Sequence, residues 1–153
     1  MKKTFLPVLA IATIISLTIG SCTKEQTLLD LLYGTWTLDQ ELDYLGVIEP
    51  FVTTVTVGSN TYVTTVATEA TFFDCNDKEE EKCYGTSKTT TTVTTNGVPD
   101  VSYGASSFEY IVFGKSQLVW NGTVYEIDEV SKKDLVIHPV SAPLAKKTYS
   151  KQK

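Results

Sequence analysis

The chain has no arginine, one histidine and three cysteines among its 153 residues. All 13 basic residues are therefore lysines, set against 18 acidic residues. Bidentate recognition of phosphates and base edges normally uses arginine, so an acidic chain without arginine is a poor candidate for binding DNA or RNA. We expect no nucleic-acid partner.

The shortage of histidine also weighs against catalysis. His138 is the sole imidazole, and no Gly-x-Ser-x-Gly motif supplies a nucleophile for it. No ligand pair is spaced to bind zinc with His138. Asp74, Asp77 and Glu79 cluster enough oxygens for calcium, but their spacing matches no known calcium loop. We expect no enzyme, no cofactor and no metal, and an enzymatic role is the least favoured of three hypotheses.

Long apolar runs are also lacking, except for one near the N-terminus. Lys2 and Lys3 precede the apolar run Phe5–Ile19, which has the length of a secretory signal and is short for a membrane-spanning helix. An aliphatic residue, two small residues and Cys22 follow. This pattern resembles the processing site of bacterial lipoproteins. An uncleaved anchor helix, or an ordinary signal peptide beside an unrelated cysteine, is the alternative.

The lipoprotein interpretation divides the chain into three parts. It predicts a signal peptide over residues 1–21, a lipidated N-terminus and spacer over 22–27, and one domain over 28–153. Two lysines and no acidic residue precede Cys22, so the remaining chain has a charge near −7 (11 − 18). Lipid on Cys22 predicts attachment to a membrane of the bacterial cell envelope, which we expect to be the outer membrane, on either face.

The two other cysteines, Cys75 and Cys83, flank a short charged loop. An exported protein meets an oxidising environment, which favours a disulfide between them over two free thiols.

Most of the remaining chain alternates like β-strands. A short amphipathic helix is expected from Glu25 to Tyr33, ending before Gly34. After it, threonine, valine and tyrosine dominate, and these residues favour strands. Thr86–Thr95 is rich in threonine, and we interpret it as an exposed strand rather than a disordered linker. The other expected strands begin near Trp36, Phe51, Tyr62, Phe108, Gln117, Val124, Leu135 and Lys146.

Turn residues separate these runs. Asn96-Gly97 and Asn121-Gly122 are strong hairpin signals because both central residues of a type I′ turn need positive φ. Gly58-Ser59 and Gly114-Lys115 are weaker ones. Eight or nine short strands in sequential order predict an all-β fold, either an antiparallel up-and-down barrel behind the helix or a sandwich.

The start of the domain is similar to a known family. Leu32-Tyr33-Gly34-Thr35-Trp36-Thr37-Leu38 places Gly-x-Trp after a short helix, and this resembles the opening of lipocalins, in particular the lipocalin-like lipoproteins of Gram-negative bacteria. The resemblance implies a barrel whose tryptophan closes one end beneath a late arginine. Because this chain has no arginine, Lys146 or Lys147 is expected to cover the ring through a cation–π contact.

The resemblance also suggests a binding function. A barrel of this size holds one small ligand or is filled by its own side chains. We expect a monomer that binds a small hydrophobic molecule; the alternative is a non-enzymatic interaction lipoprotein with a filled barrel that contacts an envelope protein or glycan. The candidate interior residues are Trp36, Leu38, Tyr62, Val66, Phe72, Phe108, Tyr110, Trp120 and Tyr125.

Overall fold

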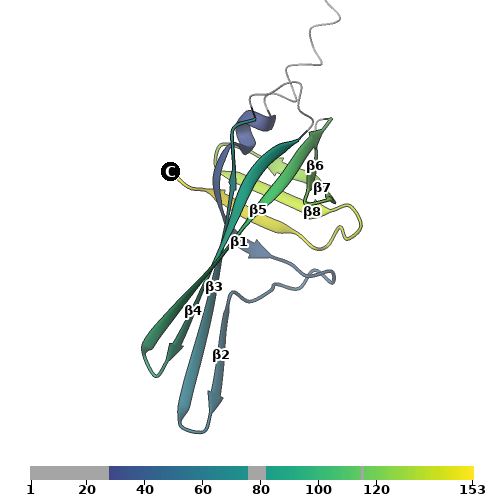
Figure 1. Cartoon of the computed structure of the whole chain (residues 1–153). Helices are drawn as coiled ribbons and strands as arrows, with labels where there is room; N and C mark the ends of the chain where they lie inside the picture. The colour runs from purple at the N-terminus through teal and green to yellow at the C-terminus, as the bar shows by residue number, and fades with distance from the viewer. Residues whose placement is uncertain (1–27, 76–81, 115) are drawn as a thin grey trace, which may run out of the picture.

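The computed structural model of the chain describes residues 28–75, 82–114 and 116–153. These residues form an antiparallel sheet closed into a barrel, with a short helix over residues 28–32 at one end (Figure 1). The strands are β1 (Gly34–Glu41), β2 (Val52–Val57), β3 (Asn60–Phe72), β4 (Cys83–Thr95), β5 (Val98–Phe113), β6 (Gln117–Trp120), β7 (Thr123–Val130), β8 (Asp134–Pro139) and β9 (Lys147–Lys151).

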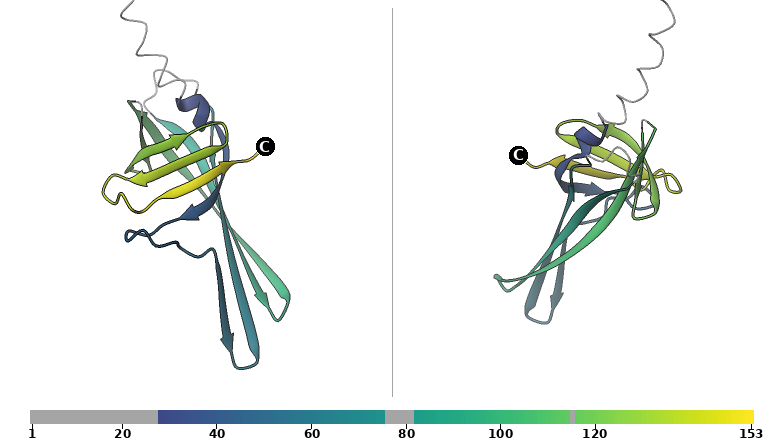
Figure 2. Two further views of the ribbon diagram at one scale, coloured as in Figure 1. Left: turned by 180° about the vertical axis from the view of Figure 1, so that it is seen from behind. Right: turned by 45° about the horizontal axis from the view of Figure 1, so that its top comes forward.

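The expected barrel is confirmed, and the sandwich is excluded. The strands follow the order β1-β9-β8-β7-β6-β5-β4-β3, and a pairing between β3 and β1 closes this ring of eight. β2 lies outside the ring and pairs with β3. Figure 2 shows the ring from behind and tilted forward.

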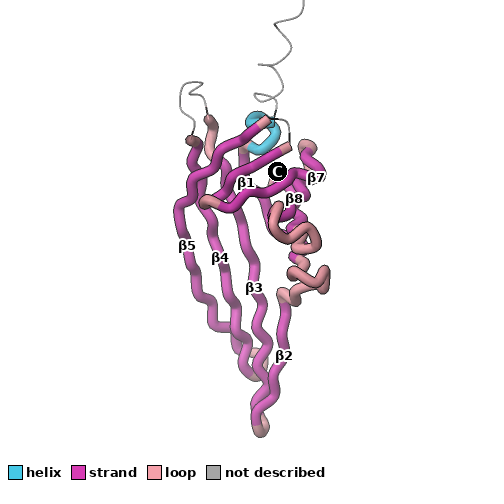
Figure 3. Tube along the Cα trace, turned by 90° about the vertical axis from the view of Figure 1, so that its right-hand side faces the viewer, coloured by secondary structure: helices cyan, strands magenta, loops and turns pink. Residues whose placement is uncertain are grey.

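The long strands β3, β4 and β5 continue beyond the ring. The last residues of β3 pair with β1, from Glu69 to Phe72, whereas its first residues, Asn60 to Thr65, pair with β2. The extensions of β4 and β5 run beside them, so four strands project from one end of the barrel (Figure 3). We call this projection the arm: β2 with residues 60–66 of β3, 89–95 of β4 and 98–105 of β5.

The predicted hairpin turns are present. Asn96 and Gly97 have φ of 51° and 86°, and Asn121 and Gly122 have φ of 49° and 78°. Positive φ at both central residues is the signature of the tight turns that match strand twist. The threonine-rich segment 86–95 is a strand, as expected, and most of it belongs to the arm.

Large side chains fill the end of the barrel near the helix. Leu28 and Leu32 of the helix pack into this core, which confirms its amphipathic character within the described residues. The signal peptide, Cys22, the spacer, the beginning of the predicted helix, Asp77, Glu79 and Lys115 lie outside the described residues. The largest fully buried side chains are Trp36, Tyr110, Phe72, Leu32, Leu118, Leu135 and Ile137.

Candidate functional site

The end of the barrel that holds the helix is closed around Trp36. Its indole Nε1 donates a hydrogen bond to the Leu32 carbonyl oxygen at 2.7 Å. The Nζ atom of Lys151 lies 5.0 Å from the centre of the Trp36 ring and donates to the Leu31 carbonyl oxygen at 3.0 Å. Burial lowers the pKa of Lys151. A lysine thus covers the Trp36 ring, as expected for a chain that has no arginine.

The lysine that covers Trp36 is not one of the two expected. In the pairing of β1 with β9, Trp36 lies opposite Lys151, whereas Lys147 lies opposite Glu41 at the far end of β1. Lys147 binds Glu41 there, and Lys146 binds Asp128. The prediction of Lys146 or Lys147 is wrong because antiparallel register, which the sequence alone does not reveal, places both lysines at the other end of the barrel.

Gly34 is required by this arrangement. Its φ is +120°, a conformation that other residues rarely adopt, and a Cβ atom there would lie 2.8 Å from Cε of Lys151. The glycine of Gly-x-Trp therefore lets the helix turn into β1 and leaves room for the lysine that covers the tryptophan.

Aromatic rings packed edge to face fill the middle of the barrel. Phe72 makes edge-on contacts with Phe108, Tyr110 and Trp120, at centroid distances of 5.2, 5.0 and 5.1 Å. The Tyr110 hydroxyl donates to the Phe73 carbonyl oxygen at 2.9 Å, and burial raises the pKa of Tyr110 to about 12. These rings belong to the packed core of the barrel. At its edge, Cys75 and Cys83 form the expected disulfide, with 5.5 Å between their Cα atoms.

The opposite end of the barrel is open. A pocket of about 340 Å³ lies there, where the ring meets the base of the arm. It falls at the small end of the range for ligand sites. The lining residues are Leu38, Glu41, Thr68, Ala70, Ser87, Ser106, Phe108, Trp120, Asn121, Thr123, Tyr125, Lys147 and Tyr149.

Aromatic rings form one wall of this pocket. Trp120 lies 4.8 Å from Phe108, 6.3 Å from Tyr125 and 6.2 Å from Tyr149, measured between ring centroids. Because Trp120 also contacts Phe72, its ring connects the packed core to the pocket. A ligand in the pocket would meet a continuous aromatic surface anchored in the core.

Polar groups form the rest of the pocket lining. Lys147 Nζ and Glu41 Oε1 form an ion pair at 2.8 Å, and both side chains are partly exposed. The Tyr149 side chain is nearly buried, and its hydroxyl has no hydrogen-bond partner in the described part of the chain. Burial, with Glu41 and then Tyr125 nearby, raises the pKa of Tyr149, so its hydroxyl is a neutral donor. Hydroxyls also come from Thr68, Ser87, Ser106 and Thr123.

The structure divides the predicted interior residues into three groups. Trp36, Phe72 and Tyr110 pack in the core, and Leu38, Phe108, Trp120 and Tyr125 line the pocket. Tyr62 and Val66 lie on the arm, so the prediction that they line the barrel is wrong. They share a strand face with Ala70 and Phe72, but they precede the section of β3 that joins the ring.

Sequence reasoning missed Glu41, Lys147 and Tyr149. The alternation of β9 places Lys147 and Tyr149 on one strand face, and this pattern could have found them. Glu41 had no such signal, because a bulge between Leu38 and Gln40 shifts its register.

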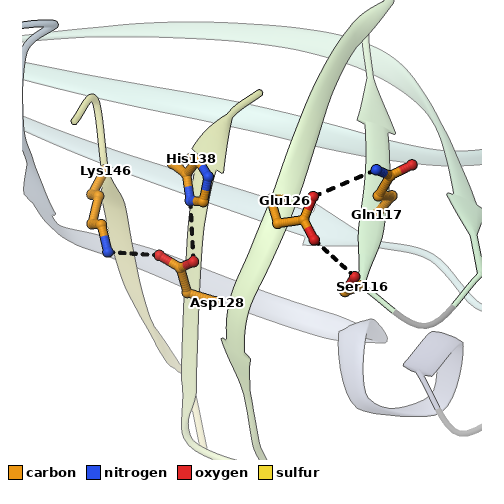
Figure 4. A network of polar contacts seen from close by, with 6 residues as sticks. All are labelled: Ser116, Gln117, Glu126, Asp128, His138 and Lys146. Atoms are coloured by element: carbon orange, nitrogen blue, oxygen red, sulfur yellow. Dashed lines mark hydrogen bonds and ion pairs between the residues drawn. The ribbon is translucent and has the colours of Figure 1, made fainter. Parts of the chain in front are cut away.

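His138 is not among the residues that line the pocket, and it lies beside Asp128 and Lys146 (Figure 4). Its Nδ1 atom is 3.1 Å from Asp128 Oδ1, and Lys146 Nζ is 2.8 Å from Asp128 Oδ2. The hydrogen bond from Lys146, followed by that from His138, holds the pKa of Asp128 below its usual value despite burial. Beside them, Glu126 accepts hydrogen bonds from Ser116 and Gln117.

The described residues contain neither a candidate metal site nor a candidate membrane-spanning helix. No three histidine, cysteine or acidic side chains gather closely enough there to hold a metal ion. No helix in that part of the chain has the length and hydropathy needed to span a membrane. Comparison with protein-family models, curated proteins and solved structures found no match for this chain.

Proposed function

We propose that this chain is a lipid-anchored envelope protein whose barrel binds a small molecule at its open end. The observation that carries the proposal is the pocket itself: an aromatic wall faces an unpartnered Tyr149 hydroxyl and the Glu41–Lys147 ion pair. Binding sites characteristically combine an apolar surface with a few converging polar groups, as this pocket does. A barrel filled entirely by its own side chains would leave no such space.

The lining indicates an amphipathic ligand. A purely hydrophobic molecule would cover the aromatic wall but would leave hydroxyls and an ion pair dehydrated without partners, which is unfavourable. A ligand with one flat apolar face and hydrogen-bonding groups on its other edge satisfies both sides of the pocket. We therefore narrow the expected hydrophobic ligand to a small molecule with one apolar face and several polar groups.

The position of the pocket relative to the proposed lipid anchor is also consistent with the binding of a small molecule from the aqueous side. The described chain begins with the helix at the closed end, whereas the arm projects from the opposite end (Figure 1). The lining residues place the pocket at the base of the arm. Six residues, 22–27, would link a lipid on Cys22 to that closed end, and they span at most about 20 Å. The pocket would then open away from the membrane and take its ligand from the aqueous side.

A binding assay with a blocked pocket tests the proposal. The fluorescent amphipath 1-anilinonaphthalene-8-sulfonate is titrated into wild type, Ser106→Phe and Ser102→Phe. Ser106 lines the pocket, whereas Ser102 lies four residues away on the same face of β5, in the arm. We expect saturable binding to wild type, at least a tenfold loss in Ser106→Phe because its ring fills the pocket, and little change in Ser102→Phe.

Native mass spectrometry of the protein purified without detergent complements this assay. A small molecule that is recovered with wild type and lost with Ser106→Phe would support the proposal. Equal dye binding by all three proteins, with no molecule recovered, would overturn it.

A further inference from the structure

The arm has one free edge, formed by β2. Among the described strands, β2 pairs only with β3. Residues of an antiparallel pair alternately bond to the neighbouring strand and point away from it. The Phe51 carbonyl accepts from Val66 N, and Val57 pairs with Asn60 across a two-residue turn, so the odd-numbered residues bond to β3. Val52, Thr54 and Thr56 therefore direct their N–H and C=O groups outward.

This edge lacks the usual protection against pairing. All six residues of β2 are exposed, and they include no charged residue, no proline and no bulge. The other edge of the arm, along β5, carries Pro99 and Asp100. Natural proteins use proline and charge to block open edges, and an edge without them is a template for another strand.

An apolar loop leads into this edge. Asp43 orders the loop, because its Oδ1 atom accepts hydrogen bonds from the N–H groups of Leu45 and Val47, both at 2.8 Å. Figures 1 and 3 show the loop on the side of β2 away from β3. It exposes more than half of each large apolar side chain, namely Tyr44, Leu45, Val47 and Ile48. An ordered, exposed apolar patch beside an open edge is typical of an interaction surface.

We propose that β2 pairs antiparallel with β2 of a second copy of this chain, centred on Thr54. In this register Thr54 lies opposite its own counterpart, and Val52 lies opposite Thr56. The outward groups of all three residues then find partners, each pair exchanging both N–H···O bonds.

The side chains suit the same register. On the other strand face, Phe51 lies opposite Val57 and Thr53 lies opposite Val55. Every cross-strand pair is thus a β-branched or aromatic combination, the kind that stabilises antiparallel sheets. The contact is isologous, so a single uncharged strand supplies both halves of the interface.

The lack of charge on β2 makes this edge a place where a second copy can approach despite its like net charge. The chain carries a net charge of −5, so two copies repel each other over most of their surfaces. At β2 no charged side chain faces its counterpart. The dimer would join the two arms into one continuous sheet with the two barrels at opposite ends. Because each copy buries little more than one strand, the interface is small, and we expect an equilibrium that depends on concentration.

The test measures the association of the full chain, purified in mild detergent, by sedimentation velocity over a range of concentrations. Thr54→Pro removes one outward N–H and leaves the bonds to β3 intact, because proline is tolerated at a strand edge when its nitrogen faces solvent. We expect its dimer dissociation constant to rise about tenfold or more. Val101→Pro removes the corresponding N–H on the β5 edge and should leave the dimer unchanged.

Cross-linking checks the register without disturbing the fold. Paired residues of this type have Cα atoms about 5.5 Å apart, within reach of a disulfide. Under mild oxidation Thr54→Cys should form a covalent dimer, whereas Thr56→Cys, which faces Val52, should not. A wild type that remains monomeric at all concentrations would overturn the proposal. So would a dimer that Val101→Pro disrupts and Thr54→Pro does not, because the β5 edge would then be the interface.

Discussion

The barrel and the arm share three strands, β3, β4 and β5, yet only the barrel has a core. Within the ring, β3 and β5 bury Ala70, Phe72, Phe108 and Tyr110. In the arm, no residue of these strands or of β4 is buried. Residues that favour strands are therefore enough to extend a ladder, but burial requires β1 and β6–β9 to close the sheet. The arm depends on cross-strand pairs, and we expect it to open before the barrel does.

Removing a core ring should produce the largest difference between the two regions. Phe72→Ala deletes a fully buried ring that contacts three other aromatic rings, so we expect it to lower the free energy of unfolding by about 3–5 kcal/mol. Val63→Ala, on the arm section of β3, should cost about 1 kcal/mol or less. Denaturant unfolding followed by circular dichroism measures both. Equal losses would mean that the arm and the barrel share one core.

Loss of the disulfide should have the next largest effect on the free energy of unfolding. It joins the barrel end of β3 to the start of β4. Replacing both cysteines by serine, Cys75→Ser with Cys83→Ser, should lower the free energy of unfolding by about 2–3 kcal/mol, since the closed loop is short. Hydrogen exchange should show faster amide opening near Phe72, while the amides of residues 61–66 change little. Faster exchange confined to the arm would contradict this.

Substitutions at two glycines with positive φ distinguish the cost of backbone strain from the cost of crowding by a neighbouring side chain. Gly34→Ala should lower the free energy of unfolding by about 1–3 kcal/mol. The new Cβ would crowd Lys151, and alanine would have to adopt an unfavourable φ. Gly58→Ala, at the tip of the arm, has a φ of +62° and nothing within 4 Å, so it should cost about 1 kcal/mol. Thermal unfolding midpoints of the two variants give the comparison. If Gly34→Ala combined with Lys151→Ala is no more stable than the sum of the two single changes predicts, crowding by Lys151 is not the cause.

The last expected effect is a pH dependence from the core, which appears only at high pH. Burial raises the pKa of Tyr110 from 10 to about 12, so the unfolded chain loses this proton before the folded one. The stability contributed by neutral Tyr110 is complete below pH 10 and decreases as the pH rises through 12. Tyr110→Phe should therefore reduce the loss of stability between pH 9 and pH 11.5, measured by urea unfolding. Tyr103→Phe, an exposed ring on the arm, serves as the control and should leave that loss as in wild type.

Much of the fold was predictable because its signals are local. The turns at Asn96-Gly97 and Asn121-Gly122 follow from the φ values that those residues tolerate, and the strands between them follow from alternation and β-branching. The pocket was predictable in part. Leu38, Trp120 and Tyr125 were recognised as interior residues, but Glu41 at the mouth was not, since a charged residue near a strand end looks like surface.

The sequence by itself determined most of the strands, their turns and the amphipathic helix, because each depends on short-range conformation or residue type. The expectation of a basic residue above Trp36 came from the resemblance of the Gly-x-Trp segment to that of lipocalins. Only the tertiary structure decided where β3 leaves the ring, which places Tyr62 and Val66 on the arm, and that Lys151 is the lysine above Trp36. Both depend on the register between strands far apart in the chain. A two-residue alternation records which face a side chain takes but not what lies opposite it.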